Sequence, residues 1–217
     1  MATAGYLTTI SVSGTSTAMT AEAMTGSGAG PYQITNSAKR VLDWTAAQPT
    51  FYDNGVAISA GDISAIDYLQ GKVTFTGSKT GPITVTGYYL PLLTVAEART
   101  VSLSFEADEL DTSVFGSQYR TSTQGLKRIT GSMEILSLPA TDLDPGAGSR
   151  SFEAVFNAGT QIVFTVTPGG VTSHRFVGAL FGTETGAAID GLVATTIPFT
   201  SQAVVAADGT QVGVTSF

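Results

Sequence analysis

Side chains of alternating polarity, rather than side chains at helical spacing, dominate this chain and restrict the folds open to it. In residues 101–138, Leu103 and Phe105 alternate with serine and glutamate, and Met133 and Ile135 alternate less regularly. A period of two places one face of a strand in a core and the other in water. The 3.6-residue period of an amphipathic helix is almost absent. We therefore predict an all-β chain with one or two short helices, folded as a β-sandwich or partly closed barrel.

The clearest local signal is a tight hairpin centred on Asn54-Gly55. Both residues tolerate the positive φ angles that a two-residue hairpin turn requires, and apolar residues lead into and out of the turn. Further strands are predicted at residues 63–68, 72–76 and 83–90, mostly bounded by glycine. Short strands this close together are typical of a β-meander.

Outside that region the sequence predicts one short helix and several more strands. Residues 15–24 contain three alanines and two methionines after a capping Thr15 or Ser16, a pattern that favours a helix. Strands are predicted at residues 162–166, 175–181 and 192–199. Residues 202–217 form either a last hairpin around Asp208-Gly209 or a strand that pairs with a neighbouring subunit.

The composition favours a subunit of an assembly. With 217 residues the chain can bury the core of a single domain, residues 1–217, in which residues 33–91 form an inserted pair of hairpins or an elaborated N-terminal half. Only 12% of the residues are charged, against a usual value of about 25%. A chain that replaces charge with Ser, Thr and Gly can have much of its surface covered by neighbours. Secreted β-proteins share this bias.

Charge and cysteine content exclude several kinds of site. The net charge of −7 argues against tight binding to a phosphate backbone, because Lys and Arg supply that affinity. The chain has no cysteine, so disulfides and thiolate metal sites are excluded. Residues 1–14 lack the basic start and apolar core of a secretory signal, and no apolar run approaches the ~20 residues of a membrane span. We expect synthesis in a cytoplasm and no membrane association.

No combination of residues predicts an enzyme, a cofactor or a metal site. The only histidine, His174, is either a base or metal ligand or, as we favour, a residue at the edge of a strand after a turn. Nucleophilic catalysis needs an activated serine beside such a base, and no Gly-x-Ser-x-Gly turn is present.

An acidic cluster, Glu106, Asp108, Glu109 and Asp111, precedes a polar segment, residues 113–128, that we read as a loop. The cluster either binds a cation, because hard cations prefer several oxygen ligands, or begins a short helix, because the helix dipole favours negative charge at the N-terminus. Three cations occur in the same region, Arg120, Lys127 and Arg128. Three roles are open to them: binding phosphate, facing solvent, or pairing with the acidic cluster across a subunit boundary. Head-to-tail pairing of two different surfaces generates rings and filaments.

A series of short motifs runs through this region: Glu109-Leu110-Asp111-Thr112, Phe115-Gly116-Ser117, Tyr119-Arg120, Gly125-Leu126-Lys127 and Gly131-Ser132-Met133-Glu134. Their order resembles the central segment of the siphophage major tail proteins, which form tail tubes. Residues 51–91 and 195–199 also resemble segments of this family.

The resemblance implies a β-sandwich that assembles into hexameric rings, which stack into a tube that conducts DNA on ejection. It implies a virion protein of the phage tail, assembled in the host cytoplasm, with copies of itself, the tape measure protein and the tail terminator as partners and DNA passing without specific binding. Contacts between subunits would come from Phe115, Tyr119, Arg120, Lys127 and Arg128. Residues facing the lumen would be the acidic Glu106, Asp108, Glu109 and Asp111.

A second hypothesis is a β-sandwich binding module of extracellular type, such as a phage decoration or tail-tip protein that binds carbohydrate or a host surface. Aromatic faces would provide the contacts, although Trp44 is more commonly a core residue in such a position. The candidates are Trp44, Tyr52, Tyr68, Tyr88 and Tyr89.

Overall fold

The structure, a computed structural model, describes residues 9–94, 98–112, 122–136, 156–167, 173–182, 184–187 and 193–216. The regular structure of these residues consists of strands with a few short helical turns, which confirms the prediction of an all-β chain. The short helical turns include two 3-10 turns, η2 (Ser37–Lys39) and η3 (Ala60–Asp62).

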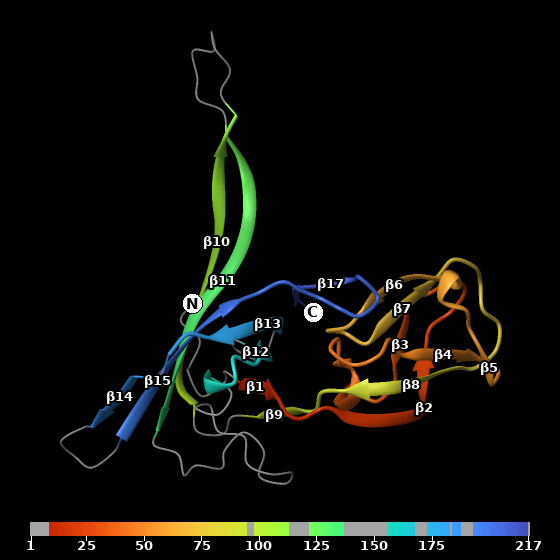
Figure 1. Ribbon diagram of the computed structural model, residues 1–217, viewed down its shortest axis with the longest axis horizontal. Helices are drawn as coiled ribbons and strands as arrows, with labels where there is room; N and C mark the ends of the chain where they lie inside the picture. The colour runs from red at the N-terminus through yellow and green to blue at the C-terminus, as the bar shows by residue number, and fades with distance from the viewer. Residues whose placement is uncertain are drawn as a thin grey trace.

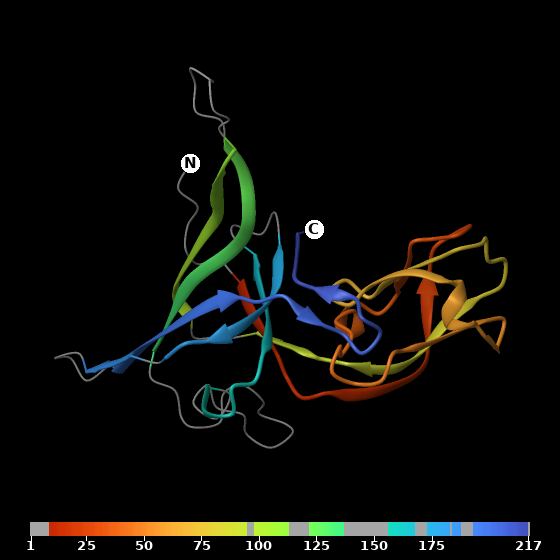
Figure 2. The same ribbon diagram turned by 45° about the horizontal axis from the view of Figure 1, so that its top comes forward.

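One sheet has nine strands in the order β10-β11-β15-β13-β12-β1-β9, with β14 beside β15 and β18 beside β13. Figures 1 and 2 show this sheet curling, with the β10–β11 hairpin rising from it. Its strands are β1 (Thr9–Ser13), β9 (Leu92–Thr94), β10 (Ala98–Asp111), β11 (Ser122–Leu136), β12 (Ile162–Thr167), β13 (His174–Leu180), β14 (Glu184–Ala187), β15 (Val193–Ser201) and β18 (Val214–Ser216).

Contacts across the sheet show how far it curls. The rings of Phe105 on β10 and His174 on β13 have centroids 5.1 Å apart. Two strands, β11 and β15, lie between them, so a flat sheet would separate β10 and β13 by about 14 Å. The sheet therefore closes partly on itself, in agreement with the predicted sandwich or partly closed barrel.

The inner face of this sheet buries a core of stacked aromatic rings. Phe164 on β12 packs against Phe176 on β13 and Phe199 on β15, with ring centroids 5.5 Å and 4.7 Å away, and the rings of Phe176 and Phe199 are 5.7 Å apart. All three side chains are buried, as are Met133 and Ile129 on β11. The base of the hairpin is thus anchored in the core.

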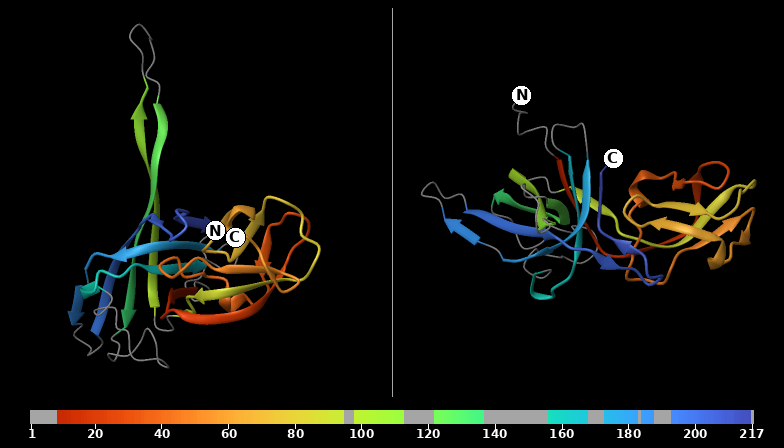
Figure 3. Two further views of the ribbon diagram at one scale, coloured as in Figure 1. Left: turned by 45° about the vertical axis from the view of Figure 1, so that its right-hand side comes forward. Right: turned by 90° about the horizontal axis from the view of Figure 1, so that it is seen from above.

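A second sheet has seven strands in the order β5-β4-β8-β2-β3-β7-β6. It lies in the chain between β1 and β9, which pair with each other, so the chain leaves the first sheet and returns to the neighbouring position. Figure 3 shows it beside the first sheet, and its core includes Val163 and Val177 from β12 and β13. Its strands are β2 (Thr17–Thr25), β3 (Tyr32–Ile34), β4 (Thr50–Asp53), β5 (Val56–Ala57), β6 (Ile63–Asp67), β7 (Lys72–Phe75) and β8 (Ile83–Tyr89).

The hairpin predicted at Asn54-Gly55 is confirmed. Asp53 pairs with Val56, and both turn residues have positive φ, 50° for Asn54 and 81° for Gly55. The Asp53 carboxylate also accepts a hydrogen bond from the Gly81 N–H at 3.0 Å, which ties the hairpin to the start of β8. The strands predicted at residues 63–68, 72–76 and 83–90 are present as β6, β7 and β8.

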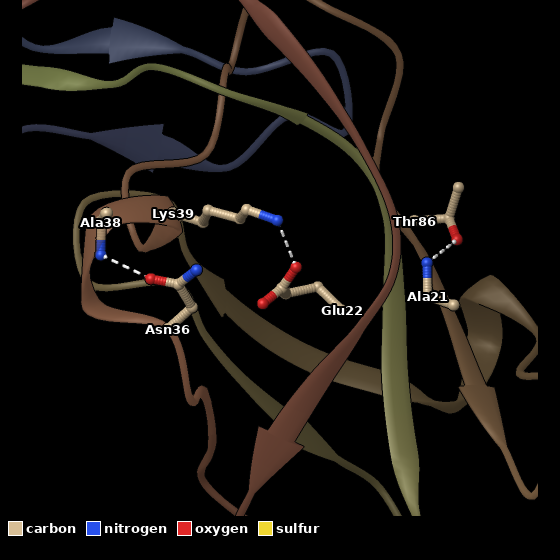
Figure 4. A network of polar contacts seen from close by, with 6 residues as sticks. All are labelled: Ala21, Glu22, Asn36, Ala38, Lys39 and Thr86. Carbon is tan, nitrogen blue, oxygen red and sulfur yellow. Dashed lines mark hydrogen bonds and ion pairs between the residues drawn. The ribbon is translucent and has the colours of Figure 1, made fainter.

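The helix predicted at residues 15–24 is wrong, because this segment is strand β2. It pairs with β8 and carries an irregularity between Met19 and Glu22, where Ala21 has φ of 48°. Figure 4 shows how polar groups stabilise this irregularity: the Ala21 N–H donates to the Thr86 hydroxyl at 3.0 Å, and Glu22 pairs with Lys39 at 2.5 Å. Pairing along β8 overrides the helix propensity of the alanines.

The C-terminal strands follow the prediction closely. Strands β12, β13 and β15 occupy the predicted segments, and the tail forms a hairpin of β16 (Val204–Val205) and β17 (Gln211–Val212) around Asp208-Gly209. Within the same chain, β18 then pairs with β13, so most of the described tail is used internally.

Candidate assembly surface

The β10–β11 hairpin contains the two longest strands among the described residues. Strand β11 pairs with β15 as far as Thr130, which faces Thr200. The next residue, Ile129, donates its N–H to the Ser201 hydroxyl at 2.8 Å. Beyond this point, among the described residues, β11 has only β10 as a strand neighbour. The hairpin therefore extends away from the body as an unsupported two-stranded ribbon (Figure 1).

Two predictions for this segment are corrected. The acidic cluster does not begin a helix, because β10 continues through Asp111. Residues 122–128 are not loop, because β11 begins at Ser122. Pairing with the opposite strand gives both segments an extended conformation that their polar sequences do not indicate by themselves.

One face of the hairpin is polar. Ser102 and Ser132 face each other with their hydroxyl oxygens 2.9 Å apart, and Glu106 faces Arg128. Ser104 and Thr130 lie between these pairs. Because cross-strand neighbours share a face, this surface is a continuous band of hydroxyls ending in an ion pair.

Arg128 has an acidic partner within its own chain, and its predicted pairing across a subunit boundary stays a prediction. The Arg128 Nε donates to Glu106 Oε2 at 2.7 Å within one chain, with 60% and 42% of the two side chains exposed. The hydrogen bond that Arg128 donates to Glu106 raises the pKa of Arg128 above its usual value. An exposed pair of this kind adds little to stability.

Exposed apolar side chains lie on the hairpin and beside it. Phe105 on β10 is 58% exposed, Leu126 on β11 is 82% exposed, and Val214 of β18 is 52% exposed. Leu126 lies where the register of the hairpin shifts between Ala107 and Glu109, and such an irregularity re-aims side chains. Phe105 and Val214 also line a groove of about 400 Å³ between the hairpin and β18.

The remaining predicted residues divide between the hairpin and segments without a description. Asp108, Glu109 and Asp111 are exposed near the end of β10, and Lys127 is exposed on β11 opposite Ala107. Phe115, Tyr119 and Arg120 lie outside the described residues. The assignment of the acidic residues to a lumen, and of Phe115, Tyr119, Arg120 and Lys127 to subunit contacts, stays a prediction.

The described part of the chain shows where His174 lies and contains no cluster of metal-ligating residues. His174 begins β13 and packs edge-on against Phe105, as expected for a residue at a strand edge. No three acidic or histidine side chains come together there in a way that could hold a metal ion. The described residues also contain no helix with the length and apolar character of a membrane span.

The aromatic candidates for a carbohydrate platform are mostly unavailable. Trp44 and Tyr68 are buried in the core of the seven-stranded sheet, at 4% and 2% exposure. Tyr52 and Tyr89 are partly buried, and Tyr88 is 47% exposed. Sugar stacking requires an accessible ring face, so Tyr88 is the residue among the five that best meets this need.

Comparisons with known proteins find distant structural likeness. No family model and no curated protein matches the chain. Among solved structures, a chain in the virion of a native gene transfer agent particle has a TM-score of 0.44 and 18% identity, covering 52% of this chain and 85% of that one. A chain in the tail of an empty gene transfer agent particle has the same TM-score and identity, covering 52% and 84%. Likenesses this distant do not assign a function.

Proposed function

We propose that this chain is a structural virion protein, the major subunit of a siphophage tail tube, and not an enzyme. Copies form hexameric rings that stack into a tube and conduct DNA during ejection. Other copies, the tape measure protein and the tail terminator are the partners, and assembly takes place in the host cytoplasm. The proposal draws on the motif resemblance between Glu109 and Glu134 and on the geometry of the hairpin that contains those motifs.

The observation that carries the proposal is the open edge of β10. This strand has 14 residues and ends the nine-stranded sheet, with β11 as its only strand neighbour among the described residues. A long unpaired edge promotes pairing with another chain unless charge, proline or irregularity blunts it. From Thr100 to Phe105 the strand has no proline, no charged residue and no register shift, so this half is open to a second copy.

The hairpin also provides surfaces for contact between rings and for passage of DNA. Leu126 exposes apolar area on the part of the ribbon beyond the sheet, and Phe105 exposes more where the ribbon meets β13. Such area is usually covered in an assembly. Asp108, Glu109 and Asp111 collect negative charge on the same ribbon. A channel lined by them would repel the DNA backbone and let it slide without binding.

The seven-stranded sheet has a separate place in this proposal. Because it is inserted between the paired strands β1 and β9, an assembly could use the nine-stranded sheet without disturbing it. We infer that this inserted part, which begins before the predicted residue 33, lies on the outside of the tube.

A charge placed on the open edge tests the proposal. Ser104→Lys adds a cation to the exposed polar face of β10, and we expect it to prevent tubes while circular dichroism stays unchanged. Ser64→Lys is the matched control, since Ser64 is an exposed serine on β6, the terminal strand of the other sheet. Assembly is measured by sedimentation velocity and negative-stain microscopy of concentrated protein.

The outcomes separate the edge from the function. Normal tubes from Ser104→Lys would show that β10 is not the assembling edge. Wild-type protein that stays monomeric at every concentration and salt would overturn the tail-tube proposal itself. Binding of that monomer to a glycan array would favour the alternative, a β-sandwich binding module.

A further inference from the structure

One face of the seven-stranded sheet is open to solvent where strands β4, β8 and β2 lie side by side. Phe51, Ile83 and Val85 lie on the other face of these strands and are buried in the core. Successive side chains in a strand alternate between faces, so the neighbours of these three residues lie on the open face, where they are exposed or partly exposed. The open face consists of Thr50, Tyr52, Ala57, Thr84, Thr86, Tyr88, Ala18 and Ala23, none of which is charged.

The strand register places two tyrosine rings at opposite ends of this open face. Tyr52 faces Thr84, and Tyr88 lies four residues further along β8, which separates the two residues by about 14 Å along the strand. Ala57 flanks Tyr52, and Ala18 flanks Tyr88. A methyl group is too small to cover a tyrosine ring, and Tyr88 is accordingly 47% exposed.

Threonine hydroxyls lie between the two rings. Thr50 faces Thr86 across β4 and β8, and Thr84 is on the same face of β8. The Thr86 hydroxyl accepts a hydrogen bond from the Ala21 N–H at 3.0 Å, so its own proton can be donated to a ligand. Figure 4 shows Thr86 on one side of β2 and β8 and the Glu22–Lys39 ion pair on the other, so this pair leaves the open face uncharged.

The size and charge of the open face favour a small neutral ligand. Three strands span about 10 Å across and the two tyrosines about 14 Å along, an area of about 140 Å². A stable protein–protein contact buries about 800 Å² on each partner, so this area is too small to hold a second copy by itself. An ionic ligand would find no opposite charge among the eight residues of the face.

We propose that the open face binds a linear neutral oligosaccharide, with one sugar ring over Tyr88 and another over Tyr52. A sugar ring has a face of C–H groups that packs on an aromatic ring, and the hydroxyls at its rim exchange hydrogen bonds with threonine. An extended chain of sugars matches a face on which two aromatic rings are separated by hydroxyls. The proposal concerns the inserted sheet alone and does not depend on the tail-tube function.

Saturation-transfer NMR of the full chain with cellohexaose, chitohexaose and maltohexaose tests this site, and isothermal titration measures the affinity. We expect saturable binding of at least one of these neutral oligosaccharides. Tyr88→Ala should weaken binding by about 3- to 10-fold, the equivalent of one aromatic contact, whereas Tyr88→Phe keeps the ring and should bind within about twofold of wild type. Phe105→Ala removes an exposed ring from the other sheet and should leave the affinity unchanged.

Three outcomes would refute the site. The first is the absence of saturation transfer to all three oligosaccharides at millimolar concentration, and the second is equal weakening by Tyr88→Ala and Phe105→Ala. The third is loss of assembly in Tyr88→Ala without sugar binding by the wild type, which would make the open face a contact between copies. Because sugar binding and assembly are measured separately, a failure to form tubes bears only on the proposed function.

Discussion

Gly131, in the motif Gly131-Ser132-Met133-Glu134, gives the sharpest test of how the hairpin joins the core. It lies on β11 opposite Leu103, with Phe199 of β15 on its other side. A Cβ atom built there would overlap the carbonyl oxygen of Ser102 and lie 2.7 Å from the Phe199 Cζ. Neither the backbone of β10 nor a buried ring can move easily, so Gly131→Ala must push the strands apart.

The magnitude follows from comparison with a glycine that has space around it. Gly77→Ala is the control, because its Cβ would have no heavy atom within 4 Å. Both variants gain the same unfolded-state entropy term on replacing glycine, so their difference isolates the clash. Overpacking of this kind costs about 1–3 kcal/mol. For a domain of this size we expect Gly131→Ala to melt roughly 2–12 °C below Gly77→Ala.

Thermal unfolding followed by circular dichroism, with differential scanning calorimetry as a second readout, measures this difference. Because Gly131 anchors the base of the hairpin, assembly of Gly131→Ala should weaken together with its stability. If the two variants melt at the same temperature, the close packing of β10, β11 and Phe199 described above is incorrect.

Two further predictions use matched pairs of residues. The buried Tyr68 hydroxyl has no hydrogen-bond partner within bonding geometry, so Tyr68→Phe should stabilise the fold by up to about 1 kcal/mol. The Tyr32 hydroxyl shares its proton between two backbone carbonyls, so Tyr32→Phe should destabilise the fold by about 0.5–1.5 kcal/mol. Burial and the nearby Asp208 raise the pKa of Tyr68, so the native state keeps this proton to a higher pH than the unfolded state. The free energy of unfolding of the wild type should therefore fall as pH rises above about 10, and that of Tyr68→Phe should fall less steeply. Urea titrations at several pH values measure this difference. Leu126→Ser should reduce assembly in sedimentation velocity without lowering the melting temperature, whereas Val205→Ser, at another exposed apolar residue, should leave assembly unchanged; equal effects would argue against a contact at Leu126.

Local signals succeeded where a few adjacent residues determine the backbone. Asn54-Gly55 predicts a hairpin because its two residues accept positive φ, and the structure has that turn. The strands around residues 162–166 and 192–199 were also predictable, since their apolar residues sit at strand spacing. The class of the fold therefore follows from the sequence.

Local signals failed where a distant partner decides the conformation. The alanines of β2 favour a helix, but β8 supplies a ladder that an extended chain can join. The acidic end of β10 and the polar start of β11 read as helix and loop, and each is a strand because the other lies beside it. In the candidate surface, only the structure shows that Glu106 of the same chain lies beside Arg128, while pairing across a subunit boundary stays a prediction.

By itself the sequence determined the all-β class, the tight turns, and a surface poor in charge, because propensity, turn chemistry and composition act over a few residues. The tertiary structure alone decided that a seven-stranded sheet is inserted between β1 and β9, that the β10 edge is open, and that Tyr52 and Tyr88 share one face of the inserted sheet. These features depend on which distant strands pair and in what register. A strand can pair with many segments that are distant in the sequence, and the energy of each such pairing depends on the whole packed fold.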